Sequence, residues 1–95
     1  MTPFSVTALA EDDLDEIWYY IAQNNPAAAD RLIDTFHDKF SLLATQPLIG
    51  QARDELRPHL RSFTVGNYVI YFHPADDRIL VIRVLHAARD ILQLF

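Results

Sequence analysis

The 95-residue sequence predicts an α+β domain in which an N-terminal helical hairpin packs on a small antiparallel β-sheet. Two patterns lead to this prediction. Apolar residues recur every three to four positions in the first half of the chain, and every second position after Leu60. The chain is 51% hydrophobic, which is enough for one core, so residues 1–95 are predicted to form a single domain.

The first half begins with alternating residues 4–9, which predict a short strand. A helix is predicted over residues 11–24. Its apolar stripe consists of Leu14, Ile17, Trp18 and Ile21. The acidic residues of its first turns favour the positive end of the helix dipole, and we expect them to be solvated. Asn25 as N-cap and Pro26 as first residue predict a second helix that ends near Thr45. The short break between the helices predicts that they pack antiparallel.

The second half predicts three antiparallel strands over residues 61–65, 68–73 and 78–85, followed by a short helix over residues 87–95. Gly66-Asn67 suits a type II′ turn, and residues 74–77 form a second turn. These turns would pair Val65 with Tyr68, and Phe72 with Ile79. The face predicted to cover the helices carries Phe63, Val65, Ile70, Phe72, Ile79 and Val81, and Arg61 and Arg83 share its parity. The opposite face, which includes Tyr71 and Val84, is half apolar, so we expect a partner chain or the protein's own tail to cover it.

Composition excludes several classes of function. The absence of cysteine excludes disulfides and zinc–thiolate sites, and the two glycines form no phosphate-binding loop. None of the four histidines has the spacing of a metal site, so neither a metal nor another cofactor is predicted. No apolar run approaches the ~18 residues of a membrane span. No signal peptide is visible, so we expect a cytoplasmic protein without a membrane partner.

Charge is distributed unevenly along the chain. Residues 1–50 carry two basic and eight acidic side chains, whereas residues 51–95 carry six arginines and five acids. The net charge of -5 argues against specific DNA binding by this chain alone. The arginines of interest are Arg53, Arg57, Arg61, Arg83 and Arg89. They form either a surface that binds phosphate or an acidic peptide, or separate local pairs with neighbouring acids.

Two further features admit two interpretations each. His86 lies at the end of the last predicted strand, between Arg83 and Arg89. It is either a functional group or a histidine whose ring is bonded to the backbone. Trp18 belongs to the predicted core stripe, whereas Tyr19 and Tyr20 point partly outward. These two tyrosines either anchor a partner helix or lie along the edge of the hairpin.

Several stretches in order along the chain resemble ParE-type toxins of type II toxin–antitoxin systems, within the RelE/ParE superfamily. These stretches are residues 13–22, 25–29, 47–56, 60–63, 68–72 and 83–90. The resemblance implies the family's α+β fold and a bacterial or plasmid-borne growth inhibitor, with a role in plasmid stabilisation. It also implies neutralisation by a ParD-like antitoxin, whose C-terminal segment binds as a helix plus an extended strand.

The two branches of the superfamily imply different activities. Characterised ParE relatives poison DNA gyrase, whereas the RelE branch cuts mRNA on the ribosome with clustered basic residues and a Tyr, or a His–Tyr pair, near the C-terminus. Here no Tyr follows Tyr71 and no Lys follows Lys39, so we expect an inhibitor that binds gyrase and is not an enzyme. The residues expected to bind antitoxin or target are Arg53, Arg57, Arg61, Tyr71, Arg83, His86 and Arg89.

Two alternatives stay open. The first is a RelE-type ribonuclease with His86 as general acid or base, and with Arg61, Arg83 and Arg89 on the phosphate. The second is an inactive toxin that only binds its antitoxin.

Overall fold

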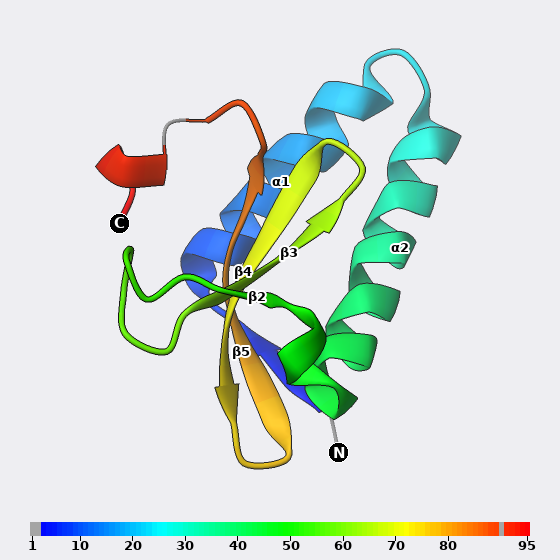
Figure 1. The fold of residues 1–95 in the computed structure, drawn as a ribbon. Coiled ribbons are helices and arrows are strands. Elements are labelled where there is room, and N and C mark those ends of the chain that lie inside the picture. The colour runs from blue at the N-terminus through cyan, green and yellow to red at the C-terminus, as the bar shows by residue number, and fades with distance from the viewer. Residues whose placement is uncertain (1–2, 90) are drawn as a thin grey trace.

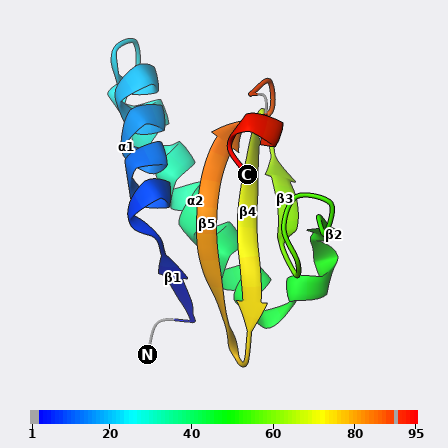
Figure 2. The same ribbon diagram turned by 90° about the vertical axis from the view of Figure 1, so that its left-hand side faces the viewer.

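A mixed sheet of five strands forms the centre of the computed structural model, which describes residues 3–89 and 91–95. Two helices cover one face of the sheet, and the C-terminal segment lies on the other (Figures 1 and 2). The elements are β1 (Phe4–Val6), α1 (Ala8–Ala22), α2 (Pro26–Thr45), the 3₁₀-helix η1 (Pro47–Ile49), β2 (Gln51–Ala52), β3 (Arg61–Val65), β4 (Tyr68–Ala75), β5 (Arg78–His86) and the 3₁₀-helix η2 (Ile91–Gln93). The strand order is β1-β5-β4-β3-β2, in which only β1 and β5 run parallel. The α+β prediction is therefore confirmed.

The helix starts follow from local capping. Helix α1 begins three residues earlier than predicted because Thr7 is its N-cap, and this ends the predicted first strand at Val6. The Thr7 hydroxyl accepts a hydrogen bond from the amide of Ala10 at 3.1 Å and donates one to the carbonyl of Ile82 at 2.8 Å. Helix α2 has the predicted bounds, and the side chain of Asn25 accepts a hydrogen bond from the amide of Ala28 at 3.0 Å.

The main core lies between the two helices and the sheet. Its fully buried aromatic residues are Phe36 and Phe40 of α2 and Phe72 of β4. Ile79 and Val81 of β5 complete the contact with the helices, as the alternation of the sequence predicted.

The register between β3 and β4 is confirmed, whereas the predicted register between β4 and β5 is wrong. Val65 pairs with Tyr68 across a turn in which Gly66 has a φ of 57°. The next turn contains only Asp76 and Asp77, because β4 continues to Ala75. Phe72 therefore pairs with Val81 and not with Ile79.

A bulge changes which side chains of β5 face the helices. The register shifts between Tyr71 and Phe72, which pair with Arg83 and Val81, so Ile82 is the additional residue. As a result Val84 joins the core under the helices, in contrast to the prediction, and Leu85 faces the other side of the sheet.

The second face of the sheet is covered by the protein's own tail. Leu60, Val69, Tyr71 and Leu85 form a second apolar cluster there, against which Leu56, Ile91, Leu94 and Phe95 pack. The predicted helix over residues 87–95 is wrong, because its described residues contain only the 3₁₀-turn of η2. No helix among the described residues has the length and hydropathy needed to span a bilayer.

Candidate functional site

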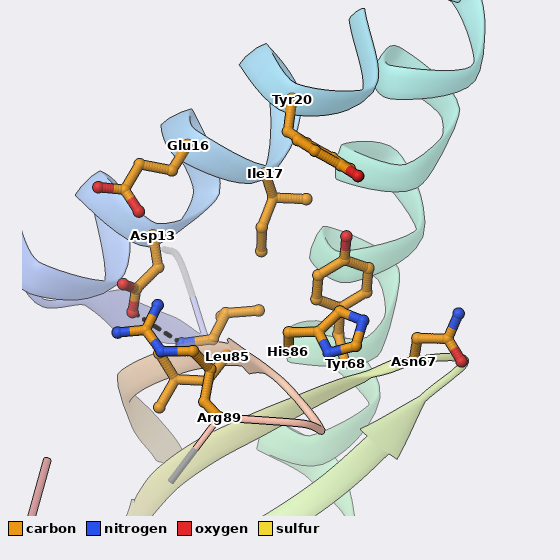
Figure 3. A pocket seen from close by; sticks show the side chains of 10 residues that line it. Asp13, Glu16, Ile17, Tyr20, Asn67, Tyr68, Leu85, His86 and Arg89 are labelled. Atoms are coloured by element: carbon orange, nitrogen blue, oxygen red, sulfur yellow. Dashed lines mark hydrogen bonds between the residues drawn. The ribbon is translucent and has the colours of Figure 1, made fainter. Parts of the chain in front are cut away.

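A pocket of 480 Å³ lies where α1 meets the β3–β4 turn and the end of β5 (Figure 3). Helix α1 contributes Asp13, Glu16, Ile17 and Tyr20; Asn67, Tyr68, Val84, Leu85, His86 and Arg89 form the opposite side. Of the seven binding residues predicted from the sequence, only His86 and Arg89 line this pocket.

Asp13 joins α1 to β5 through a buried ion pair. Its carboxylate accepts hydrogen bonds from Nε and Nη2 of Arg83 at 2.7 and 2.9 Å, and the two side chains are 8% and 14% exposed. It also accepts a hydrogen bond from the backbone amide of Val84 at 3.1 Å. The pair raises the pKa of the Arg83 guanidinium, chiefly through the hydrogen bond to Asp13.

This pair corrects the expectation that all acids of α1 are solvated. Strand β1 pairs with β5 only as far as Val81, so within the described part of the chain the backbone of Val84 has no strand partner on that side. The carboxylate of Asp13 takes the place of such a strand. The sequence carried a signal, because Asp13 lies four residues before Ile17 on the buried side of the helix.

Two tyrosines and a histidine form the aromatic part of the pocket. Figure 3 shows the hydroxyl groups of Tyr20 and Tyr68 pointing toward one another. Burial raises the pKa of Tyr68, and the neighbouring Tyr20 raises it further. The Tyr68 ring meets that of His86 edge-on, with centroids 5.4 Å apart.

His86 is bonded to the backbone, as the simpler interpretation of the sequence predicted. Its Nδ1 accepts a hydrogen bond from the amide of Ala88 at 3.1 Å. An accepting Nδ1 carries no proton, so in the neutral ring Nε2 holds the hydrogen and remains a donor.

Arg53 and Arg61 are bound by protein groups away from the pocket. Arg53 donates from Nε to the Ser62 hydroxyl at 2.9 Å and pairs with Glu55 at 3.5 Å. Arg61 donates to the backbone carbonyls of Pro47 at 3.1 Å and Leu48 at 3.3 Å, and also to that of Gly50. The Arg53–Glu55 pair agrees with local pairing, whereas Arg61 binds backbone carbonyls in place of a neighbouring acid.

The last two residues of the predicted binding set, Arg57 and Tyr71, both contact Phe95 of the C-terminal tail. The Cζ atom of Arg57 is 5.2 Å from the ring centroid of Phe95, in a cation–π contact. Tyr71 is 2% exposed, with its ring 5.1 Å from that of Phe95, and burial raises its pKa. The tail therefore separates Tyr71 from solvent.

Trp18 corrects another expectation, because it lies at the surface and not in the core. It is 37% exposed, and its Nε1 donates a hydrogen bond to Asp30 of α2 at 2.8 Å. Among residues 3–89 and 91–95, no group of three or more His, Asp or Glu side chains is arranged to hold a metal ion.

Comparison with known proteins identifies the family. Residues 4–91 match the family described as "ParE toxin of type II toxin-antitoxin system, parDE". Toxin ParE1 of Caulobacter vibrioides is 32% identical over 92 residues, which cover 95% of this chain and 94% of that protein. Toxin ParE1 of Mycobacterium tuberculosis is 27% identical over 90 residues, covering 93% and 92% of the two chains.

Solved structures share the fold. A chain from the chromosomal ParDE system of P. aeruginosa superposes with a TM-score of 0.72 at 21% identity, covering 90% of this chain and 96% of that one. A conserved hypothetical protein of Helicobacter pylori gives a TM-score of 0.60 at 13% identity, with both chains fully covered. The sequence match and the shared fold agree, and the chain belongs to the ParE toxin family of type II toxin–antitoxin systems.

Proposed function

We propose that this toxin arrests growth by binding DNA gyrase in the cytoplasm, without catalysis of its own, and that a ParD-like antitoxin neutralises it. The observation that carries the proposal is that arginines expected to bind phosphate in a ribonuclease are bound by the protein itself. Two of the three arginines that a ribonuclease would use on phosphate are bound to protein groups: Arg83 to Asp13 and Arg61 to backbone carbonyls.

The electrostatics of the pocket support a binding protein over an RNA-cleaving enzyme. General acid–base cleavage of RNA needs a proton donor close to the cations that hold the phosphate. His86 shares its pocket with Arg89, but the carboxylates of Asp13 and Glu16 line the same pocket. Asp13 is neutralised by Arg83, whereas Glu16 has no ion-pair partner among the described residues and repels a phosphate.

The sheet edge supports an antitoxin that adds a strand. Strand β2 pairs only with Arg61 and Ser62, so the outer edge of β3 from Phe63 to Val65 has no strand partner in the described part of the chain. Such an edge is a template for an extended peptide. The ParDE origin of one structural neighbour agrees with a ParD-like partner.

A gyrase assay tests the proposal. The purified chain is added to gyrase, ATP and relaxed plasmid, and supercoiled and linear DNA are measured. We expect loss of supercoiling, or linear DNA released by denaturant, and recovery when the cognate antitoxin is added first. Unchanged supercoiling and no linear DNA at micromolar excess of the toxin would refute gyrase as the target.

A RelE-type ribonuclease is the second candidate, because His86 and Arg89 share a pocket with two tyrosine hydroxyls. It predicts that the chain blocks a purified translation system with cleavage of mRNA, and that His86→Ala abolishes this effect while the circular dichroism spectrum is unchanged. If growth is unhindered on induction without the antitoxin, the toxin is inactive.

A further inference from the structure

Three consecutive aromatic residues of α1 are exposed. Trp18 is 37% exposed, Tyr19 67% and Tyr20 72%. Large aromatic side chains with this exposure are typical of binding surfaces, where they bury apolar area at small entropic cost. Trp18 donates a hydrogen bond to Asp30 and Tyr20 lines the pocket beside Tyr68, yet more than half of each tyrosine stays exposed.

Two hollows lie on either side of Tyr19. One, of 430 Å³, is lined by Asp15, Glu16, Tyr19, Tyr20 and Gln23. The other, of 510 Å³, is lined by Trp18, Tyr19, Ala22, Gln23 and Pro26. Tyr19 and Gln23 belong to both, so these two residues, one helical turn apart, form a ridge between the hollows. A ridge flanked by hollows is the shape that receives the side chains of another helix.

The charge around the ridge restricts what can bind. Helix α1 carries five acidic residues and no basic one. Asp15 and Glu16 are exposed beside the first hollow, and neither forms an ion pair among the described residues. A second copy of this chain would bring the same negative face, and a nucleic acid would bring phosphates, so both would be repelled.

We propose that the Tyr19–Gln23 ridge, with Trp18 on one side and Tyr20 on the other, is the face that docks a basic amphipathic helix of a partner protein. Apolar side chains one turn apart on that helix fill the hollows beside Tyr19, and its Lys or Arg side chains contact Asp15 and Glu16. The first hollow adjoins the pocket around His86, because Glu16 and Tyr20 line both, whereas Trp18 and Tyr19 line only the hollows. The inference is independent of gyrase as the target.

A synthetic peptide tests the surface directly, since Trp18 is the only tryptophan of the chain and reports on one of the hollows. The probe is a helical peptide of about 18 residues without aromatic residues. It has Leu at i, i+3, i+4 and i+7, and Lys on both flanks. Binding is measured by Trp18 fluorescence and by calorimetry in about 0.15 M salt. We expect saturable binding of this peptide and none of the same peptide with Glu in place of Lys.

Two alanine variants test whether peptide binding depends on the ridge or on any exposed apolar side chain. Tyr19→Ala should weaken peptide binding by about tenfold or more, because it removes a wall of both hollows. The matched control, Leu48→Ala, removes a side chain that is 79% exposed in η1, and it should change the affinity by less than about twofold. Equal affinities of the parent chain and Tyr19→Ala would overturn the proposal.

Charge reversal tests whether the peptide contacts Asp15 and Glu16 or is only attracted by the net negative charge of the chain. The double variant Asp15→Lys, Glu16→Lys should abolish binding, whereas Asp34→Lys, Asp38→Lys on exposed positions of α2 makes the same change in net charge and should retain most of it. Equal losses in both variants would overturn the proposal, as would equal binding of the Glu peptide. Sedimentation of the free chain as a dimer that Tyr19→Ala dissociates would assign the face to a second copy instead. Circular dichroism verifies that each variant is folded.

Discussion

Replacing Asp13 with Asn should destabilise the toxin more than any other change of one acid on α1. The substitution keeps an oxygen that accepts the hydrogen bond of the Val84 amide, but it removes the negative charge beside Arg83. Arg83 is then a guanidinium that is 14% exposed and has lost its carboxylate partner.

The size of the effect follows from the burial of the pair. Loss of one member of a buried ion pair costs about 3–5 kcal/mol, because the remaining charge stays desolvated. Because the side chains of Asp13 and Arg83 are still 8% and 14% exposed, we expect a cost at the lower end of this range, about 3 kcal/mol. With a urea slope of roughly 1.5 kcal/mol/M for a small domain, the unfolding midpoint should fall by about 2 M.

A double-mutant cycle in urea measures the interaction. Arg83→Met should also cost about 3 kcal/mol, and the double variant Asp13→Asn, Arg83→Met should cost no more than either single change. The control Asp12→Asn alters an exposed acid next to Asp13 and should change stability by less than about 0.5 kcal/mol. Single changes below about 1 kcal/mol that simply add in the double variant would refute the argument.

Three further predictions concern packing and pH. Gly50→Ala should lower the free energy of unfolding in urea by about 1–3 kcal/mol, since a Cβ there would lie 2.7 Å from Cζ of Phe72; an unchanged midpoint contradicts this contact. Phe95→Ala should cost about 1–2 kcal/mol by calorimetry and expose Tyr71 to iodide quenching; quenching equal to that of the parent would show that the tail covers nothing. Burial, with Arg57 and His59 nearby, lowers the pKa of His73 below its usual 6.5. The contribution of neutral His73 to the free energy of unfolding is therefore fully present above pH 6.5. It is lost as the pH falls through the lower pKa that His73 has in the folded protein. His73→Gln should flatten the decrease in urea midpoint between pH 7.5 and pH 5, and an equal decrease in both proteins rejects the assignment.

The elements with local signals were predicted well from the sequence. Asn25 and Pro26 fix the start of α2, and Gly66 fixes the turn between β3 and β4. The turn after β4 was predicted too long because Pro74 and Ala75 were assigned to it, although both extend the strand. Asp77, with a φ of 60°, supplies the left-handed residue that lets two residues reverse the chain, and Asp tolerates this conformation without a distinctive signal.

The candidate site was predicted less well, because its partners are distant in sequence. The sequence predicted five arginines acting together or pairing with nearby acids. Arg83 instead pairs with Asp13, which is 70 positions away, and Arg61 binds backbone carbonyls of η1. Neither partner can be found from periodicity, which describes one element at a time. The bulge that turns Val84 toward the helices likewise has no local signal.

Because β1 pairs in parallel with β5, the toxin can complete its fold only late in its synthesis. Phe4 pairs with Ile79, and the hydroxyl of Thr7 donates to Ile82, a separation of 75 positions. Loop closure over such a distance makes folding slow, and a ribosome makes β5 late. A nascent chain interrupted before residue 79 contains both helices but has no strand against which β1 can pair. The closed fold of this toxin therefore forms only after its message has been translated through β5.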